Sequence, residues 1–295
     1  MPRAALFSIN ARVKGTMPST WEDPSLVQLW GPRFHVYVVA ARDLPVFSLG
    51  RLPDGGKTRE KAEDLAARLR AFLGAGRMRY DEAGQALGVH GNSLRYAALT
   101  GTLALRWEGA RRPTVWTVPP PEIDAAQATL ELARRYLHIF GPATPEGFAK
   151  WAGIGARKAV GAFDDLGSER IPVQTPSGDA WILGGDEPAL REPPGPAAPA
   201  RLLPSGDAYT LGMTSEDRAL LVPDADRRRE LWTPRVWPGA ILVAGNVVGT
   251  WRRAQARVTV QTWQGLSRAA REAVTAEAES LPLPETSERI VVHWD

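Results

Sequence analysis

The chain has 295 residues, of which 44% are hydrophobic and 23% are charged, and this is enough for two or three globular units. It has no cysteine and only four histidines, which excludes disulfides and cysteine nucleophiles and argues against a zinc site. The net charge of +3 is uneven, because residues 1–121 hold 17 Lys and Arg against 10 Asp and Glu, whereas the remainder holds 19 against 23.

A basic half suits contact with a polyanion, although a solvated surface on an arginine-rich chain would give the same count. No stretch reaches the length of a membrane-spanning helix, and the N-terminus lacks the long apolar run of a signal peptide. We therefore expect a cytoplasmic protein that does not enter a membrane.

Residues 58–118 predict three helices followed by two strands. Thr58 can cap the first helix, which carries an apolar stripe, and glycines follow each helix. The remaining predictions are a short helix at 81–87 closed by Gly88, a third helix capped by Asn92 or Ser93, and strands at 102–107 and 114–118.

Residues 122–183 repeat this order in register. Thr144 can cap the second helix, with Pro145 at its first position, and the third helix runs over 157–166. A hairpin follows, with strands at 171–175 and 180–183. Equivalent residues lie 65 positions apart, as in the pairs Gly88 and Gly153, and Trp116 and Trp181. Three helices and a hairpin are typical of a winged helix, which docks on DNA or, in other proteins, on a protein partner.

Residues 184–200 have the composition of a linker. The region beyond it alternates in strand fashion at 241–244, 247–248 and 257–263, and a helix is predicted over 267–281, with a last edge strand at 290–292. We expect a small β-barrel or an open sheet with one helix. Arg227–Arg229 are predicted to lie in a polar loop with Asp224 and Asp226.

The third helices carry the residue types that read base edges and phosphates. Asn92 and Arg95 lie early on the first of them, and Arg157 and Lys158 hold the same place in the second copy. Asn92 is equally explained as a helix cap, and the basic residues as solvated side chains.

Three further sites also allow both a functional and a structural interpretation. Arg111 and Arg112 form the tip of the first hairpin, where a minor-groove or phosphate contact competes with simple solubilisation. Arg252 and Arg253 follow Trp251 in a basic cluster, although a core tryptophan is the simpler explanation for Trp251. Asp207 is either a buried polar anchor, an active-site carboxylate or a turn residue.

Several stretches resemble the AlkZ-like alkylpurine DNA glycosylase family. The run ARRYLHIFGPATP at 133–145, with Phe148 and Trp151, resembles the family's RYLxxFGPATxxDFxxWxG. RLLP at 201–204, with Asp207 and Tyr209, resembles RLLPxFDxYxxG, and GNVVGTW at 245–251 resembles dGxvvGTW. These motifs occur in the family's order over nearly the whole chain.

The resemblance implies three tandem winged helices and a C-terminal β-domain that bind double-stranded DNA. It also implies hydrolysis of the N-glycosidic bond of bulky alkylated purines, without metal or organic cofactor. The family's catalytic Gln-x-Gln or Gln-x-Asp precedes a PRAA segment. Here Pro2–Ala5 follow Met1 directly, so we expect the catalytic pair upstream of Met1, or a truncation.

The family's TWxxRGTxHLV matches this chain at Trp30 and Arg33, which adds Arg33 to the predicted DNA-binding residues. Tyr37 stands where the pattern has histidine, and His35 lies two positions earlier. A helix at 4–13 and a strand at 36–39 would be the remnant of the first winged helix.

We predict an α+β protein with five segments: a first winged-helix remnant at 1–57, a second winged helix at 58–121, a third at 122–184, a linker at 185–200 and a β-rich, barrel-like domain at 201–295. The expected function is that of a monomeric, monofunctional DNA-repair glycosylase. The alternatives are a non-enzymatic DNA-binding regulator and a protein-interaction scaffold.

Overall fold

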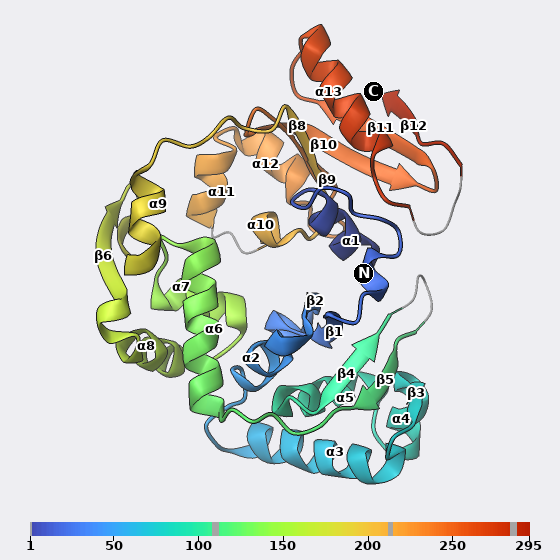
Figure 1. Cartoon of the computed structure of the whole chain (residues 1–295), viewed down its shortest axis with the longest axis vertical. Coiled ribbons are helices and arrows are strands. Elements are labelled where there is room, and N and C mark those ends of the chain that lie inside the picture. Colours follow the sequence, from blue (N-terminus) through green and yellow to red (C-terminus); the bar gives the residue numbers. More distant parts are fainter. Residues whose placement is uncertain (1, 108–111, 212–214, 284–287) are drawn as a thin grey trace. The chain divides into compact units, whose positions relative to one another are not determined.

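The computed structural model describes residues 2–107, 112–211, 215–283 and 288–295. The chain forms two compact units (Figure 1). Unit 1 is built from Pro24–Glu192, and unit 2 from Arg3–Asp23 together with Pro193–Asp295. The prediction of an α+β fold is confirmed, because both units combine helices with sheets. Residues of the predicted 1–57 segment contribute to both units.

Unit 1 begins with a hairpin of β1 (Leu26–Trp30) and β2 (Val36–Ala40). The strands are joined by the turn η2 (Pro32–Phe34), in which Arg33 and Phe34 have φ of 54° and 59°. Residues other than glycine rarely adopt this left-handed backbone conformation, so the turn is strained. A turn η3 (Ala41–Asp43) and the short helix α2 (Leu44–Leu49) follow.

The first repeat has the predicted order, with one strand added. Its elements are α3 (Lys57–Leu73), β3 (Arg77–Arg79), α4 (Tyr80–Ala86), η4 (Gly91–Ser93), α5 (Leu94–Ala97), η5 (Ala98–Thr100), β4 (Leu103–Arg106) and β5 (Thr114–Thr117). The sheet has the order β2-β1-β4-β5-β3, so the β1–β2 hairpin extends the sheet of this repeat. Leu65, Leu69, Leu94, Leu103 and Val115 form its core.

Two predicted helix caps in this repeat were wrong. Helix α3 begins at Lys57 after Gly56 rather than behind Thr58. His90 caps the turn η4 that leads into the third helix, because its Nδ1 accepts from the backbone N–H of Asn92. Ser93 holds the N-cap position of α5, but its side chain makes no cap hydrogen bond.

The second repeat comprises α6 (Ala125–Phe140), α7 (Pro145–Ala152), α8 (Ala156–Asp165), β6 (Arg170–Thr175) and β7 (Gly178–Leu183). Thr144 caps α7 as predicted, by accepting from the N–H of Gly147. Ala143 forms a β-bridge with Trp181, just as β3 pairs with Trp116 in the first repeat. The two repeats therefore share a third strand position. Phe148, Trp151 and Phe163 dominate the core.

The predicted linker begins with ordered structure, η7 (Gly184–Asp186) and α9 (Glu187–Arg191). Residues 192–199 are irregular and almost fully exposed before β8 (Ala200–Leu203) begins. The proline-rich composition explains this, because proline lacks the N–H that a ladder or helix needs.

Unit 2 is an open sheet with the order β12-β11-β10-β9-β8, made of β8, β9 (Gly239–Val243), β10 (Asn246–Ala254), β11 (Arg257–Thr262) and β12 (Val291–Trp294). Within the described residues no pairing joins β8 to β12, so the barrel-like prediction was wrong for this sheet and its open alternative holds. Helix α13 (Arg268–Glu279) packs on the sheet through Val274 and Ala278, and Figure 1 shows it lying along the strands.

Unit 2 has further helices besides α13; the first of them matches the helix predicted at 4–13, and the others were not predicted. They are α1 (Pro2–Asn10), η1 (Thr20–Glu22), α10 (Ala208–Leu211), α11 (Ser215–Leu221) and α12 (Ala225–Leu231). Arg227–Arg229 lie on α12 rather than in a loop, because the carboxylate of Asp224 accepts from the N–H groups of Asp226 and Arg227 and starts a helix.

The GNVVGTW motif at 245–251 supplies the second residue of the β9–β10 turn and the first six residues of β10. Ala244 and Gly245 have φ of 48° and 83°, which is the two-residue turn that suits the twist of a hairpin. Gly249 lies at a register shift, where a Cβ would fall 2.1 Å from the backbone oxygen of Gln261. Trp251 is buried and donates from Nε1 to the Leu203 oxygen at 2.8 Å, so it is a core residue.

Among the described residues, the helices lack the combination of length and apolar character that a membrane span requires.

Candidate nucleic-acid interface

The predicted interface residue Arg95 is turned toward the protein in the structure. Its guanidinium lies 5.0 Å from the ring centroid of Phe34 and 5.5 Å from that of Tyr96. The Arg95 side chain is half-buried, and its Nε is buried without a hydrogen-bond partner. Asn92, three residues earlier, is exposed. In the third helix of the first repeat, Asn92 is therefore exposed to solvent, while Arg95 packs on the β1–β2 turn.

The same phenylalanine also meets a buried arginine. Arg51 is only 4% exposed, lies 5.1 Å from the Phe34 centroid, and donates to the oxygens of Trp30 at 2.9 Å and Ala152 at 3.0 Å. Burial lowers the pKa of Arg51 to about 10, so the guanidinium stays charged at neutral pH. This side chain ties the β1–β2 hairpin to the end of α7. No periodicity in the sequence indicated this role for Arg51.

In the second repeat, Arg157 and Lys158 have different environments. Arg157 is exposed in the first turn of α8. The Lys158 side chain is 11% exposed, and its Nζ donates to the Leu52 oxygen at 2.8 Å and to Asp54 at 2.7 Å. Because its ammonium is already engaged, we leave Lys158 out of the interface proposed below.

The first hairpin tip is only partly described. Arg111 lies outside the described residues, whereas Arg112 is exposed and forms an ion pair with Asp81, which also binds Arg79 at 2.9 Å. Both arginines hold the pKa of Asp81 below its ordinary value, although burial opposes them. Without DNA, Arg112 is thus part of a surface ion-pair network, and a DNA phosphate that binds Arg112 would have to displace Asp81.

Each repeat stacks an arginine on its equivalent tryptophan. Arg77 lies 4.4 Å from the centroid of Trp116, and Arg170 lies 4.1 Å from that of Trp181. The sequence predicted that the two tryptophans occupy equivalent positions in the repeats, but it did not predict the arginines that stack on them. Arg77 faces Trp116 across the sheet, and Arg170 approaches Trp181 from the neighbouring strand, so only strand pairing reveals these contacts.

Arg33 is exposed on the strained β1–β2 turn. The turn lies against Gly153, which has φ of 71° and whose Cβ position would be 3.4 Å from the Arg33 nitrogen. Burial and the nearby Arg33 charge lower the pKa of His35, so its neutral form is favoured. The Tyr37 ring packs on Gly31, where a Cβ would lie 2.7 Å from Cδ2, and burial raises the pKa of Tyr37.

In unit 2, Arg252 and Arg253 alternate across strand β10. Arg252 is exposed and donates from Nη2 to the Val236 oxygen at 3.2 Å. Arg253 is half-buried, lies 5.6 Å from the Phe7 centroid and contacts the Gln255 oxygen. The period of a strand explains the difference, because adjacent residues face opposite sides.

Asp207 lies at the centre of a closed polar cluster. Its carboxyl group is buried, with the residue 1% exposed, and accepts from Ser8 Oγ at 2.6 Å and the Tyr209 N–H at 2.9 Å. Arg12 adds a bidentate pair at 2.9 and 2.8 Å. Hydrogen bonding to Asp207 raises the pKa of Arg12. With both oxygens occupied, Asp207 serves as a polar anchor between α1 and α10.

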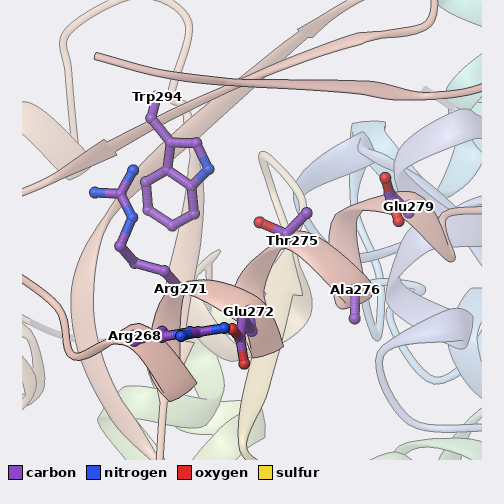
Figure 2. Close-up of a pocket in the computed structure, with 7 residues that line it drawn as sticks. All are labelled: Arg268, Arg271, Glu272, Thr275, Ala276, Glu279 and Trp294. Carbon is purple, nitrogen blue, oxygen red and sulfur yellow. The ribbon is translucent and has the colours of Figure 1, made fainter.

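A hollow on unit 2 has balanced charge (Figure 2). It lies between α13 and Trp294, and Figure 2 shows Arg271 alongside the indole, with the guanidinium 4.2 Å from the ring centroid. Arg268 pairs with Glu272 at 2.8 Å, and Glu279 pairs with Arg289 at 3.4 Å. The remaining lining residues are Thr275 and Ala276. This mixture of signs does not distinguish a phosphate site. Within the described part of the chain, no three His, Asp or Glu side chains are grouped to hold a metal ion.

Comparisons with known proteins agree on one family. Over 162 residues the chain is 30% identical to the interstrand DNA cross-link repair glycosylase of Streptomyces sahachiroi, a match that covers 54% of this chain and 42% of that relative. The chain thus matches less than half the length of that relative. The solved structure of Streptomyces sahachiroi DNA glycosylase AlkZ has the same fold, with a TM-score of 0.76 at 19% identity over 99% of this chain and 89% of that chain. A model of the family described as DNA glycosylase AlkZ-like matches residues 1–282, which confirms the resemblance, and the chain therefore belongs to the AlkZ-like DNA glycosylase family.

Proposed function

We propose that this protein is a DNA-repair glycosylase that binds double-stranded DNA and hydrolyses the N-glycosidic bond of bulky alkylated purines. The family match over residues 1–282 carries the proposal. In this reaction water adds to the sugar C1′, the purine leaves with its bonding electron pair, and an abasic site remains in an intact strand. The damaged nucleotide must leave the base stack before water reaches the bond.

We propose further that the two repeats are tandem winged helices, at 58–121 and 122–184, preceded by part of a first at 1–57 and followed by a β-rich domain at 201–295. Their support is the common order of three helices and a hairpin, and the third strand position, held by β3 in the first repeat and by Ala143 in the second. A basic surplus of seven charges in residues 1–121 fits a phosphate-binding face.

The proposed contact residues are predicted residues whose side chains are exposed or, for Arg95 and Arg253, half-buried. In unit 1 they are Arg33, Asn92, Arg112 and Arg157, with Arg95 contributing through the edge that its stacking leaves accessible. In unit 2 they are Arg252 and Arg253. Arginine suits this role because its planar group binds phosphate in a bidentate manner.

Base release tests the proposed reaction. The probe is a duplex with one guanine that carries a bulky N7 alkyl group, and the unmodified duplex is the control. We expect release of the free alkylpurine and strand cleavage only after alkali, because the first product is an abasic site. Direct strand cleavage without alkali would overturn the proposed chemistry.

A matched pair of variants tests the proposed interface. Arg157→Ala should weaken duplex binding and lower the slope of log affinity against log salt by about 0.9, the change for one lost phosphate contact. Lys158→Ala removes a cation that is already bound within the protein, so its salt slope should equal that of the wild type. Equal slopes for all three proteins would contradict the assignment of Arg157.

A non-enzymatic DNA-binding protein is the second candidate. Tyr37 favours it, because this tyrosine stands where the family pattern has histidine and its ring is packed on Gly31 rather than offered to solvent. Salt-dependent binding of alkylated and unmodified duplex with equal affinity, without base release, would support this candidate over the enzyme.

A further inference from the structure

The segment between α12 and β9 presents an apolar side chain at an exposed bend. Val236 is 68% exposed, more than any other large hydrophobic side chain in the described residues. Its neighbours Pro234 and Arg235 are also exposed, whereas Pro238 is buried where β9 begins. We call residues 232–238 the Val236 loop. An exposed valine alone is unremarkable, so its setting decides what it does.

Aromatic and cationic side chains hold the loop at both ends. The Arg218 guanidinium lies 5.0 Å from the centroid of Trp232 and 5.3 Å from that of Trp237. Trp232 also donates from Nε1 to the Thr210 oxygen at 3.2 Å. The Val236 loop is therefore fixed on its scaffold at its first and sixth residues.

A third contact reaches the tip itself. Arg252 on β10 donates from Nη2 to the Val236 oxygen at 3.2 Å. Pro234 and Pro238 further restrict the backbone on either side. A loop that is held in this way loses little conformational entropy when its apolar tip meets a partner, which favours binding.

The charge around the loop selects the kind of partner. Arg218, Arg235 and Arg252 contact or belong to the loop, and residues 232–238 include no acidic residue. Glu230, the acidic residue that precedes the loop, accepts from Trp263 Nε1 at 2.7 Å. A partner must therefore combine negative charge with an apolar surface. Duplex DNA does so, because phosphates flank the stacked faces of its bases.

We propose that the Val236 loop contacts duplex DNA, with Val236 placed at a base step as an apolar wedge and Arg235 on a neighbouring phosphate. Apolar wedges partly unstack a base step and bend the duplex, and unstacking is easiest beside a missing or damaged base. The loop would then help to expose the damaged nucleotide. This inference rests on the proposed function, since it assumes that the protein binds duplex DNA.

The test uses the full chain and a duplex with 2-aminopurine beside an abasic-site analogue, because 2-aminopurine brightens when it unstacks. Wild-type protein should raise the fluorescence on binding. Val236→Ser should abolish most of that rise and weaken affinity about tenfold, as expected for the loss of one buried valine. Val291→Ser is the matched control, since Val291 is 60% exposed in the same unit, and should behave like the wild type.

Arg235→Ala should instead lower the salt slope by about 0.9 while leaving the fluorescence rise of the saturated complex unchanged. If the wild type does not bind the duplex, the proposed function fails together with this inference. If the wild type binds and both valine variants match it in affinity and fluorescence, the proposed function stands and the Val236 loop is excluded from the DNA interface.

Discussion

Arg51 and Asp207 are buried ionic side chains whose charges are stabilised in different ways. Asp207 has an opposite charge beside it in Arg12. Arg51 binds neutral carbonyl oxygens instead, and burial lowers its pKa to about 10 without removing the charge at neutral pH. Its planar group suits the task, because separate N–H donors reach two oxygens that a single ammonium cannot bridge.

We therefore expect Arg51→Lys to lower the free energy of unfolding by about 2–4 kcal/mol, since it leaves at least one buried carbonyl without a partner. Arg59→Lys is the control, because Arg59 lies on the surface of α3 and pairs with Glu63. Urea unfolding measures both variants. Equal stability of Arg51→Lys and the wild type would show that one donor is sufficient.

Glu277 provides a pH dependence at the residue scale. Burial raises its pKa above the ordinary 4.5, although Arg201 at 3.3 Å opposes this. Because the folded state holds this proton more tightly than the unfolded state, the stabilisation is complete below about pH 4.5 and is lost as the pH rises through the raised pKa.

The stability of wild type relative to Glu277→Gln should accordingly fall as the pH rises from about 4.5 through the raised pKa of Glu277, because the glutamine never acquires the buried charge. Urea unfolding at a series of pH values measures the difference. Glu146→Gln, on the exposed face of α7, is the control. A fall of the same size for both variants would remove Glu277 as the cause.

At the scale of elements, close backbone contacts explain a motif glycine. Gly249 lies in β10 beside β11, and a Cβ there would fall 2.1 Å from the Gln261 oxygen and 2.8 Å from the Thr262 Cα. These are backbone atoms of a paired strand, so they cannot move aside without breaking the ladder. The contrast is Gly161 in α8, where an added Cβ meets nothing within 4 Å.

Gly249→Ala should cost about 3 kcal/mol, through displacement of β10 from β11. Gly161→Ala should stabilise the protein by about 0.5–1 kcal/mol, since alanine reduces the entropy of the unfolded chain and favours a helix. Thermal unfolding compares the two. A similar effect of both alanines would mean that the strand adapts to the added methyl group.

The elements also show where sequence patterns succeed. The helix order and the Thr144 cap could be predicted because they depend on neighbours within a few residues, and the 65-residue repeat could be found because the same local patterns recur along the chain. The three-residue strand β3 and the bridge at Ala143 could not, because their pairing depends on strands that lie about 40 residues further along the chain.

At the scale of the whole molecule, the chain leaves unit 2 after Asp23 and returns to it at Pro193. Helix α1 is tied to the later segment, because Ser8 and Arg12 bind Asp207, 199 and 195 residues away in the sequence. The exposed segment 192–199 is the covalent link from unit 1 to the later part of unit 2. Residues 3–23 are held to that later part by non-covalent contacts as well, through Ser8 and Arg12.

A protease site inserted after Pro194 would test this topology. After cleavage, the fragments should elute together under native conditions and separate in urea, because α1 on one fragment packs in unit 2 of the other. Asp207→Ala in the same cleaved protein should promote their separation. Native mass spectrometry reads out both forms, and prompt separation of the unsubstituted fragments would contradict the role of α1.

The α+β class, the repeated order of helices and hairpins, and the family were all predictable from the amino-acid sequence, since they follow from local propensity and from motifs within short stretches. The exposure of each cationic side chain, by contrast, depends on how the chain packs in three dimensions. Arg95 packs on Phe34 and Lys158 binds Asp54, while Arg157 stays exposed. The same packing makes Asp207 an anchor. The physical reason is that a side chain's partners come from segments distant in the chain, and burial against them, rather than residue type, sets whether a charge meets solvent.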